Sequence, residues 1–240
     1  MENLAIIIPT HNRVKLLSRL LDQLLKQKKP DSISLMTIFV VDDGSCDDTQ
    51  IILKENYPTV QIIVGSGNWW WTKSINAGLK KALSSGYDYF LILNDDNEVD
   101  EDYLKILFID YRSLEPGSLL GSASVSLEQE KKIDSSGTYN FRKLDCKHIH
   151  FHPRGAMIDD SFKGVKHCVC FSGRGTLIPK TLIKNVGYLD ERMVQYGSDE
   201  DFVLRCSERS IPVYISWNAR VLNHTSMTSY GKFKTQLKHS

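Results

Sequence analysis

Two of the adjacent carboxylate pairs in the sequence come at or close to the end of a short apolar run. Asp42 and Asp43 follow one run, and Asp95 and Asp96 follow another. Neighbouring carboxylates repel each other, so the pairs are unfavourable unless a cation or a donor-rich ligand joins them. Mg²⁺ and Mn²⁺ prefer carboxylate oxygens and share their remaining ligand positions with substrate phosphates. The pairs therefore predict a site for a divalent cation and a phosphorylated ligand.

The first half of the chain contains the elements that must position these pairs. Short apolar runs alternate there with segments of helical period. We expect strands at 4–8, 37–41, 60–64 and 89–93, and helices at 14–25, 47–56, 72–85 and 100–113. This alternation predicts βαβ crossovers and a mainly parallel sheet. Ligands bind beyond the carboxyl ends of such strands, so both acidic pairs are expected at one edge.

The second half is less regular. Strand-like pieces are expected at 119–125, 132–137, 167–171, 213–215 and 219–222, and helices at 180–186 and 200–210. Residues 226–240 form a polar, basic tail. Because neither a linker nor an internal repeat separates the halves, we expect a single domain over residues 1–240.

Composition excludes several classes of protein. With 240 residues, of which 41% are hydrophobic and 25% charged, the chain is typical of a globular protein. Its 30 basic and 29 acidic residues nearly cancel, so no general attraction for nucleic acid is expected. Five cysteines without a CxxC pair, and no long apolar run, favour a cytoplasmic protein without a transmembrane segment. Trp70 replaces the third glycine of a dinucleotide fingerprint, which argues against a dehydrogenase.

Four sequence blocks carry a specific resemblance. They are IIIPTHNR, VVDDGSCDDT, NDDN after YFLIL, and FSGRGTLIPKTLIKNVGYLDE followed by YGSDEDFVLR. In this order and spacing, over roughly residues 4–224, the chain resembles a family 2 glycosyltransferase with the nucleotide-sugar GT-A fold. The resemblance implies an α/β, Rossmann-like domain with helices on both faces of the sheet. It also implies a nucleotide-binding half at about 1–115 and an acceptor-binding half at about 116–225.

The resemblance places a nucleotide-sugar against residues from the first four strand ends. Asp43 is expected to contact the base, and Asn94 occupies the first Asp position of the family's DxD-type motif. The expected nucleotide-sugar contacts are Pro9, Thr10, Asn12, Arg13, Asp42, Asp43, Asn68, Lys73, Asn94 and Asp95. Asp96, with His224 as a further ligand, is expected to hold Mn²⁺ or Mg²⁺.

The resemblance also implies a catalytic base within Ser198-Asp199-Glu200-Asp201. Aligning the family's EDxDLxxR pattern on Arg205 favours Asp199, with Ser198 in place of the usual Glu. The literal pair Glu200 and Asp201 gives a competing register. A third interpretation is that these acids only favour the helix dipole at a helix N-terminus.

Gly173, Arg174 and Trp71 are expected on the acceptor side. Glycine permits close approach of a ligand, and Arg174 can bind a phosphate or a hydroxyl. Of the three consecutive tryptophans, one or two are expected in the core, and at least one as an apolar platform for a sugar ring.

The implied activity is inverting transfer of a sugar from a UDP- or dTDP-sugar to a hydroxyl of a saccharide or lipid-linked saccharide. The implied setting is bacterial surface-polysaccharide synthesis, in the cytoplasm or at the inner face of the membrane. A homodimer is left open. The alternative is a non-catalytic nucleotide-sugar-binding or partner subunit, because Ser198 and Asn94 replace acidic residues of the usual motifs.

Overall fold

The computed structural model describes residues 2–128, 132–142, 144 and 147–224. The basic tail expected at 226–240 lies outside the described residues. Within the described part of the chain, no helix combines the length and apolar character needed to cross a membrane.

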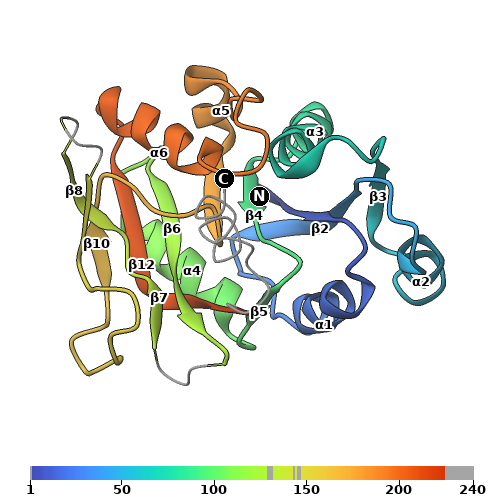
Figure 1. Ribbon diagram of the computed structural model, residues 1–240, viewed down its shortest axis with the longest axis horizontal. Coiled ribbons are helices and arrows are strands. Elements are labelled where there is room, and N and C mark those ends of the chain that lie inside the picture. Colours follow the sequence, from blue (N-terminus) through green and yellow to red (C-terminus); the bar gives the residue numbers. More distant parts are fainter. Residues whose placement is uncertain (1, 129–131, 143, 145–146, 225–240) are drawn as a thin grey trace, which may run out of the picture.

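A ten-stranded sheet runs through both halves of the chain (Figure 1). Its main path has the order β10-β12-β6-β11-β4-β1-β2-β3, with β5 paired to β12 and β7 to β6. The strands are β1 (Glu2–Thr10), β2 (Ile33–Asp42), β3 (Gln61–Val64), β4 (Tyr89–Ile92), β5 (Asn97–Val99), β6 (Leu119–Ser126), β7 (Ile133–Ser135), β10 (Val165–His167), β11 (Thr176–Pro179) and β12 (Val213–Asn223). Two further strands, β8 (Thr138–Arg142) and β9 (Lys147–His150), form a separate hairpin. β1 is parallel to β2 and β4, and β2 is parallel to β3, which confirms the predicted α/β class.

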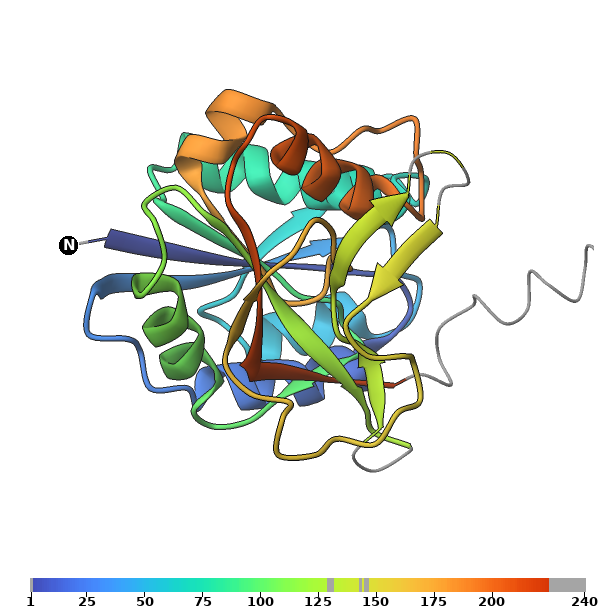
Figure 2. The ribbon, with the colours of Figure 1, turned by 90° about the vertical axis from the view of Figure 1, so that its left-hand side faces the viewer.

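Helices cover both faces of this sheet (Figures 1 and 2). They are α1 (Val14–Leu25), α2 (Thr49–Asn56), α3 (Trp70–Ser84), α4 (Tyr103–Arg112), α5 (Lys180–Val186) and α6 (Ser198–Glu208). Ala5 and Ile7 of β1 pack in the core under α3, α5 and α6, whereas Leu4, Ile6 and Ile8 pack in the core under α1 and α4. Alternate strand residues thus serve the two layers, which explains why the central strands are apolar throughout.

Two expectations about strands of the second half are wrong in detail, and two strands there were not expected. The strand expected at 167–171 is β10, which ends at His167. The strands expected at 213–215 and 219–222 are one strand, β12, with a register shift between Ser216 and Arg220. Thr138–Arg142 and Thr176–Pro179 are strands that the apolar pattern did not predict.

Strand β11 brings the two halves of the chain together at the carboxyl edge of β4. It is antiparallel to β4, with Thr176 opposite Ile92, and Gly175 donates its N–H to the Ile92 carbonyl at 2.9 Å. Residues 172–175 therefore lie at the sheet edge where Asn94, Asp95 and Asp96 follow the end of β4. The C-terminal end of β12 reaches the same region, because Asn223 pairs with Asn97 of β5.

Candidate active site

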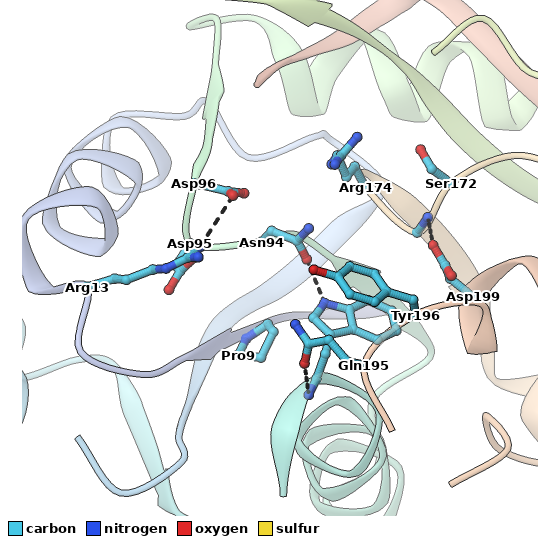
Figure 3. A pocket seen from close by; sticks show the side chains of 12 residues that line it. Pro9, Arg13, Asn94, Asp95, Asp96, Ser172, Arg174, Gln195, Tyr196 and Asp199 are labelled. Atoms are coloured by element: carbon cyan, nitrogen blue, oxygen red, sulfur yellow. Dashed lines mark hydrogen bonds and ion pairs between the residues drawn. The ribbon is translucent and has the colours of Figure 1, made fainter. Parts of the chain in front are cut away.

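Two adjoining hollows lie at this carboxyl edge. We call the first, of about 160 Å³, the acidic pocket; it is shown in Figure 3. Its lining residues are Pro9, Arg13, Trp71, Asn94, Asp95, Asp96, Ser172, Gly173, Arg174, Gln195, Tyr196 and Asp199. We call the second, of about 300 Å³, the tryptophan pocket. Its lining residues are Pro9, Thr10, His11, Arg13, Asp43, Gly67, Trp70, Trp71, Ser74, Asp95 and Gln195. The shared residues make the two hollows parts of one cleft.

Arg13 joins the two carboxylates of the second acidic pair. Its Nη1 lies 3.2 Å from Oδ1 of Asp95 and 3.4 Å from Oδ2 of Asp96. Thr10 donates its hydroxyl to Oδ2 of Asp95 at 2.8 Å. Burial raises the pKa of Asp95 to about 6, an effect that Arg13 opposes and Asp96 increases. One guanidinium therefore balances two buried acids, which leaves a net negative charge here when both acids are ionised.

Asp96 fits a divalent cation. Its Oδ1 is buried and has no hydrogen-bond partner. A carboxylate oxygen without a partner is costly to bury, and a cation would satisfy it. Asp96 is the group that would hold Mg²⁺ or Mn²⁺, with further ligands from substrate phosphates, as is usual for Mg²⁺.

The imidazole of His224 lies apart from both pockets. Its Nε2 is 2.9 Å from Oε1 of Glu98 and 3.0 Å from Nη1 of Arg19. Only the main chain reaches the acidic edge, because the His224 N–H donates to the Asp96 carbonyl at 3.3 Å. Among the described residues, no group of three His, Cys, Asp or Glu side chains forms a metal cluster. Asp96 therefore lines the acidic pocket, whereas His224 lines neither pocket.

The three candidate bases on α6 point in different directions. Asp199 lines the acidic pocket, where its Oδ2 accepts the N–H of Gly173 at 2.6 Å. Asp201 pairs with Arg205, whose Nε lies 2.7 Å from its Oδ2. Glu200 lies 3.8 Å from His148, outside both pockets. Burial, and then the charge of Asp199, raise the pKa of Glu200 to about 7, although 48% of its side chain is exposed. Of the three, Asp199 alone faces the cleft.

Ser198 is a packing residue. It is fully buried, and its hydroxyl lies 2.6 Å from that of Thr72 on α3. Thr72 also donates to the Met193 carbonyl, and its N–H bonds the Val194 carbonyl at 3.2 Å. These bonds join the start of α3 to the segment that leads into α6.

The first acidic pair holds the loops around the tryptophan pocket. Asp43 accepts three backbone N–H groups, from Gly67, Trp69 and Trp70, each at 2.8 Å. Asp42 is fully buried and accepts from the Ser45 N–H and the Gln50 side chain. Asp43 lines the tryptophan pocket, whereas Asp42 lines neither pocket. The predicted direct contact of Asp42 with a nucleotide therefore has no support in the geometry.

Three further residues expected to contact the nucleotide-sugar do not line the cleft. The Asn12 side chain accepts the Cys46 N–H at 2.7 Å and so joins the loops after β1 and β2. Lys73 is exposed, with its Nζ 5.4 Å from the Trp69 ring, and Asn68 is exposed on the loop before α3. By contrast, Pro9, Thr10, Arg13, Asn94 and Asp95 all line the cleft as expected.

The expected acceptor-side residues Gly173, Arg174 and Trp71 come together in the acidic pocket. The Trp71 indole N–H donates to Oδ1 of Asn94 at 2.7 Å. Arg174 donates to Oδ2 of the buried Asp134 at 2.9 Å, and Arg154 pairs with the other oxygen of Asp134 at 2.7 Å. The Asn94 amide oxygen thus accepts a hydrogen bond from Trp71, as the carboxylate of an aspartate at this position could also do.

Several cleft residues were not predicted from the sequence. They are His11, Gly67, Trp70, Ser74, Ser172, Gln195 and Tyr196. His11, Ser172 and Tyr196 sit inside the quoted blocks, so their position was a usable signal, whereas nothing marks Ser74 or Gln195. In the described part of the chain, five buried side-chain atoms lack a partner, and four of them belong to cleft residues: Ser74 Oγ, Asp96 Oδ1, Ser172 Oγ and Arg174 Nε. Such atoms mark a surface that a polar ligand completes.

Comparison with solved structures gives the fold an independent test. S. aureus TarS 1–349 matches with a TM-score of 0.64 at 17% identity, covering 92% of this chain and 60% of that one. The same protein in complex with UDP-GlcNAc matches with a TM-score of 0.64 at 16% identity, covering 93% and 58%. Its complex with UDP gives 0.63 at 17% identity, covering 93% and 60%. This chain therefore spans less than two thirds of those TarS chains, and the likeness shows the fold.

Comparison of sequences identifies the family. No curated protein matches the sequence. The sequence model of glycosyl transferase family 2 matches residues 5–177, which hold most of β1, all of β2 to β4, both acidic pairs and the Gly173–Arg174 turn. The chain therefore belongs to glycosyltransferase family 2 and has the GT-A fold.

Proposed function

We propose that this protein is an inverting glycosyltransferase that moves a sugar from a UDP- or dTDP-sugar to a hydroxyl acceptor. One observation carries the proposal. Asp96, with an unpartnered buried oxygen, and Asp199, oriented by Gly173, line the same pocket from different elements (Figure 3). Displacement at an anomeric carbon needs these two functions: stabilisation of a leaving diphosphate and removal of the acceptor proton.

The proposed reaction is a single displacement. Asp199 takes the proton of the acceptor hydroxyl, the acceptor oxygen bonds to the anomeric carbon, and the bond from that carbon to the diphosphate oxygen breaks. Attack from the face opposite the leaving group inverts the configuration. Arg13 lies beside Asp95 and Asp96, where its charge offsets theirs. A divalent cation held by Asp96 would supply Lewis-acid stabilisation of the departing diphosphate.

The tryptophan pocket is the proposed nucleotide site. It adjoins the acidic pocket through Pro9, Arg13 and Asp95, so a nucleoside there would place its diphosphate near Asp96. TarS, whose fold this chain shares, has been solved with UDP and with UDP-GlcNAc, which supports a nucleotide-sugar donor. Asp42 and Asn12 would act by holding the surrounding loops.

The acceptor is proposed to enter on the side of Arg174 and Trp71. A hydroxyl of a saccharide or lipid-linked saccharide in bacterial surface-polysaccharide synthesis is the class that the family blocks suggest. The reaction would then take place in the cytoplasm or at the inner face of the membrane. The case for a non-catalytic subunit is weaker than the sequence suggests, because Ser198 and Asn94 have structural roles of their own.

A nucleotide panel tests the proposal. Purified protein is screened by thermal shift with UDP, dTDP, GDP and CDP, each with and without Mn²⁺, and then assayed for slow hydrolysis of the matching nucleotide-sugars. We expect a metal-dependent rise in melting temperature with UDP or dTDP, because a ligand of the native state stabilises it by mass action. Absence of both binding and hydrolysis across the panel would refute the proposal.

A further inference from the structure

Trp70 has an unusual position at the mouth of the tryptophan pocket. Its side chain lines the pocket, yet 57% of the residue is exposed. Its φ of 56° lies in the left-handed region, which is unfavourable for a bulky residue. The Trp70 N–H is held by Oδ2 of Asp43 at 2.8 Å. A bulky aromatic kept exposed and in a strained conformation packs little apolar surface, so the strain is best explained by a ligand.

Ser74 provides a second, independent observation in the same pocket. It lies four residues after Trp70 on α3, and both residues line the tryptophan pocket. Ser74 is 1% exposed, and its hydroxyl has no hydrogen-bond partner. A buried hydroxyl usually finds a carbonyl or a water, and leaving it unpaired is costly. The pocket thus presents an aromatic face at its mouth and an unsatisfied hydroxyl at its wall.

We propose that Trp70 and Ser74 form the nucleobase site of the donor nucleotide. The indole stacks on the base, and the Ser74 hydroxyl bonds a carbonyl at the base edge, as uracil and thymine offer. This inference rests on the proposed function, which supplies the nucleotide.

Asp43 has a different role in this arrangement. Its three backbone donors, among them the Trp70 N–H, fix the turn that presents the indole. The turn leaves no room for a larger side chain, because a Cβ on Gly65 would lie 2.6 Å from Oδ1 of Asp43. Asp43 is therefore a positioning residue for Trp70.

The test compares a ligand that has a base with one that lacks it. Binding of UDP and of inorganic pyrophosphate, both with Mg²⁺, is measured by calorimetry on the full chain. Trp70→Ala is expected to weaken UDP binding by about tenfold or more, the usual effect of losing an aromatic partner of a base. Ser74→Ala is expected to weaken UDP binding by a few-fold. Neither change should alter pyrophosphate binding. Tyr139→Ala, which removes another half-exposed aromatic outside both pockets, should alter neither.

Fluorescence provides a second readout, with a variant that keeps an aromatic ring at position 70. UDP should quench tryptophan emission in the parent protein, and Trp70→Phe should remove most of that quenching while UDP still binds. UDP affinity of Trp70→Ala within twofold of the parent, an equal loss of UDP and pyrophosphate binding, or quenching that persists in Trp70→Phe would each overturn the inference. A parent protein that binds neither UDP nor pyrophosphate would instead refute the proposed function itself.

Discussion

The backbone N–H of Gly173 donates a hydrogen bond to Oδ2 of Asp199 at 2.6 Å. This bond joins the turn before β11 to the first turn of α6, two segments that meet only through the tertiary fold. A Cβ at position 173 would lie 2.8 Å from the Asp199 Cβ, so only glycine allows this approach. The carboxylate proposed as the base is thus fixed in position by a backbone donor.

Asp199→Asn is expected to lower kcat by about 10²- to 10⁴-fold, the usual contribution of a general base. The KM for the donor should change little, because the variant keeps the size and polarity of the side chain. Steady-state kinetics on the active nucleotide-sugar measures both. Asp201→Asn is the control: it weakens the ion pair with Arg205 and should cost up to about 1 kcal/mol of stability while leaving kcat in place. The reverse result would favour the alternative register.

Gly173→Ala should separate nucleotide binding from catalysis. The added methyl group meets the Asp199 Cβ at 2.8 Å and the Trp71 ring at 3.0 Å, so Asp199 must move. We expect kcat to fall by at least about tenfold, since small displacements of a reacting group are costly. UDP binding, measured by calorimetry, should stay within a few-fold of the parent. Unchanged kcat in a folded variant would show that Asp199 tolerates displacement and is not the base.

Asp96→Asn should abolish the metal dependence of nucleotide binding. The substitution removes the charge that an unpartnered buried Oδ1 offers to a cation. In the parent protein Mn²⁺ is expected to increase the melting-temperature shift caused by UDP, and in the variant Mn²⁺ should add nothing. His224→Asn is the matched comparison, because its imidazole bonds Glu98 and Arg19 outside the pockets. Loss of the Mn²⁺ effect in His224→Asn would instead indicate that His224 is a ligand of the metal.

Ser198→Ala should reduce stability by about 1 kcal/mol, the usual net value of one buried hydrogen bond. The lost bond is the one between its hydroxyl and that of Thr72, at 2.6 Å. Urea unfolding measures the change, and kcat should remain close to that of the parent. A large loss of kcat with unchanged stability would mean that Ser198 takes part in the chemistry.

Glu200→Gln should alter how stability depends on pH. Folding raises the pKa of Glu200 from 4.5 to about 7, so the folded protein binds the proton of this carboxyl group more tightly than the unfolded chain does. The contribution to stability is therefore complete below about pH 4.5 and is lost as the pH rises through 7. Glutamine removes this loss, and the variant should gain stability relative to the parent between pH 5 and pH 8. Solvent reaches 48% of the side chain, which limits the size of the gain. Urea unfolding at pH 5 and at pH 8 measures this gain. The same stability difference between variant and parent at both pH values would contradict the raised pKa of Glu200.

Local patterns in the sequence are sufficient to locate the parallel half of the fold. Apolar runs and helical periods involve residues close together in the chain, so they predict β1, β2, β4 and the helices between them. Because parallel strands present their carboxyl ends at one edge, the same patterns also predict that Asp43 and Asp96 share one cleft. The family blocks add the turn at Gly173 and the acids of α6.

The tertiary fold selects which of these polar groups face the cleft. Successive residues on a helix point about 100° apart, so the orientation of α6 selects Asp199 and turns Asp201 toward Arg205. At the end of β2, Asp42 and Asp43 lie on alternate sides, and only Asp43 reaches a pocket. The antiparallel insertion of β11 beside β4 brings Gly173 and Arg174 to Asp96. These outcomes depend on contacts between distant segments, which no local pattern of residues encodes.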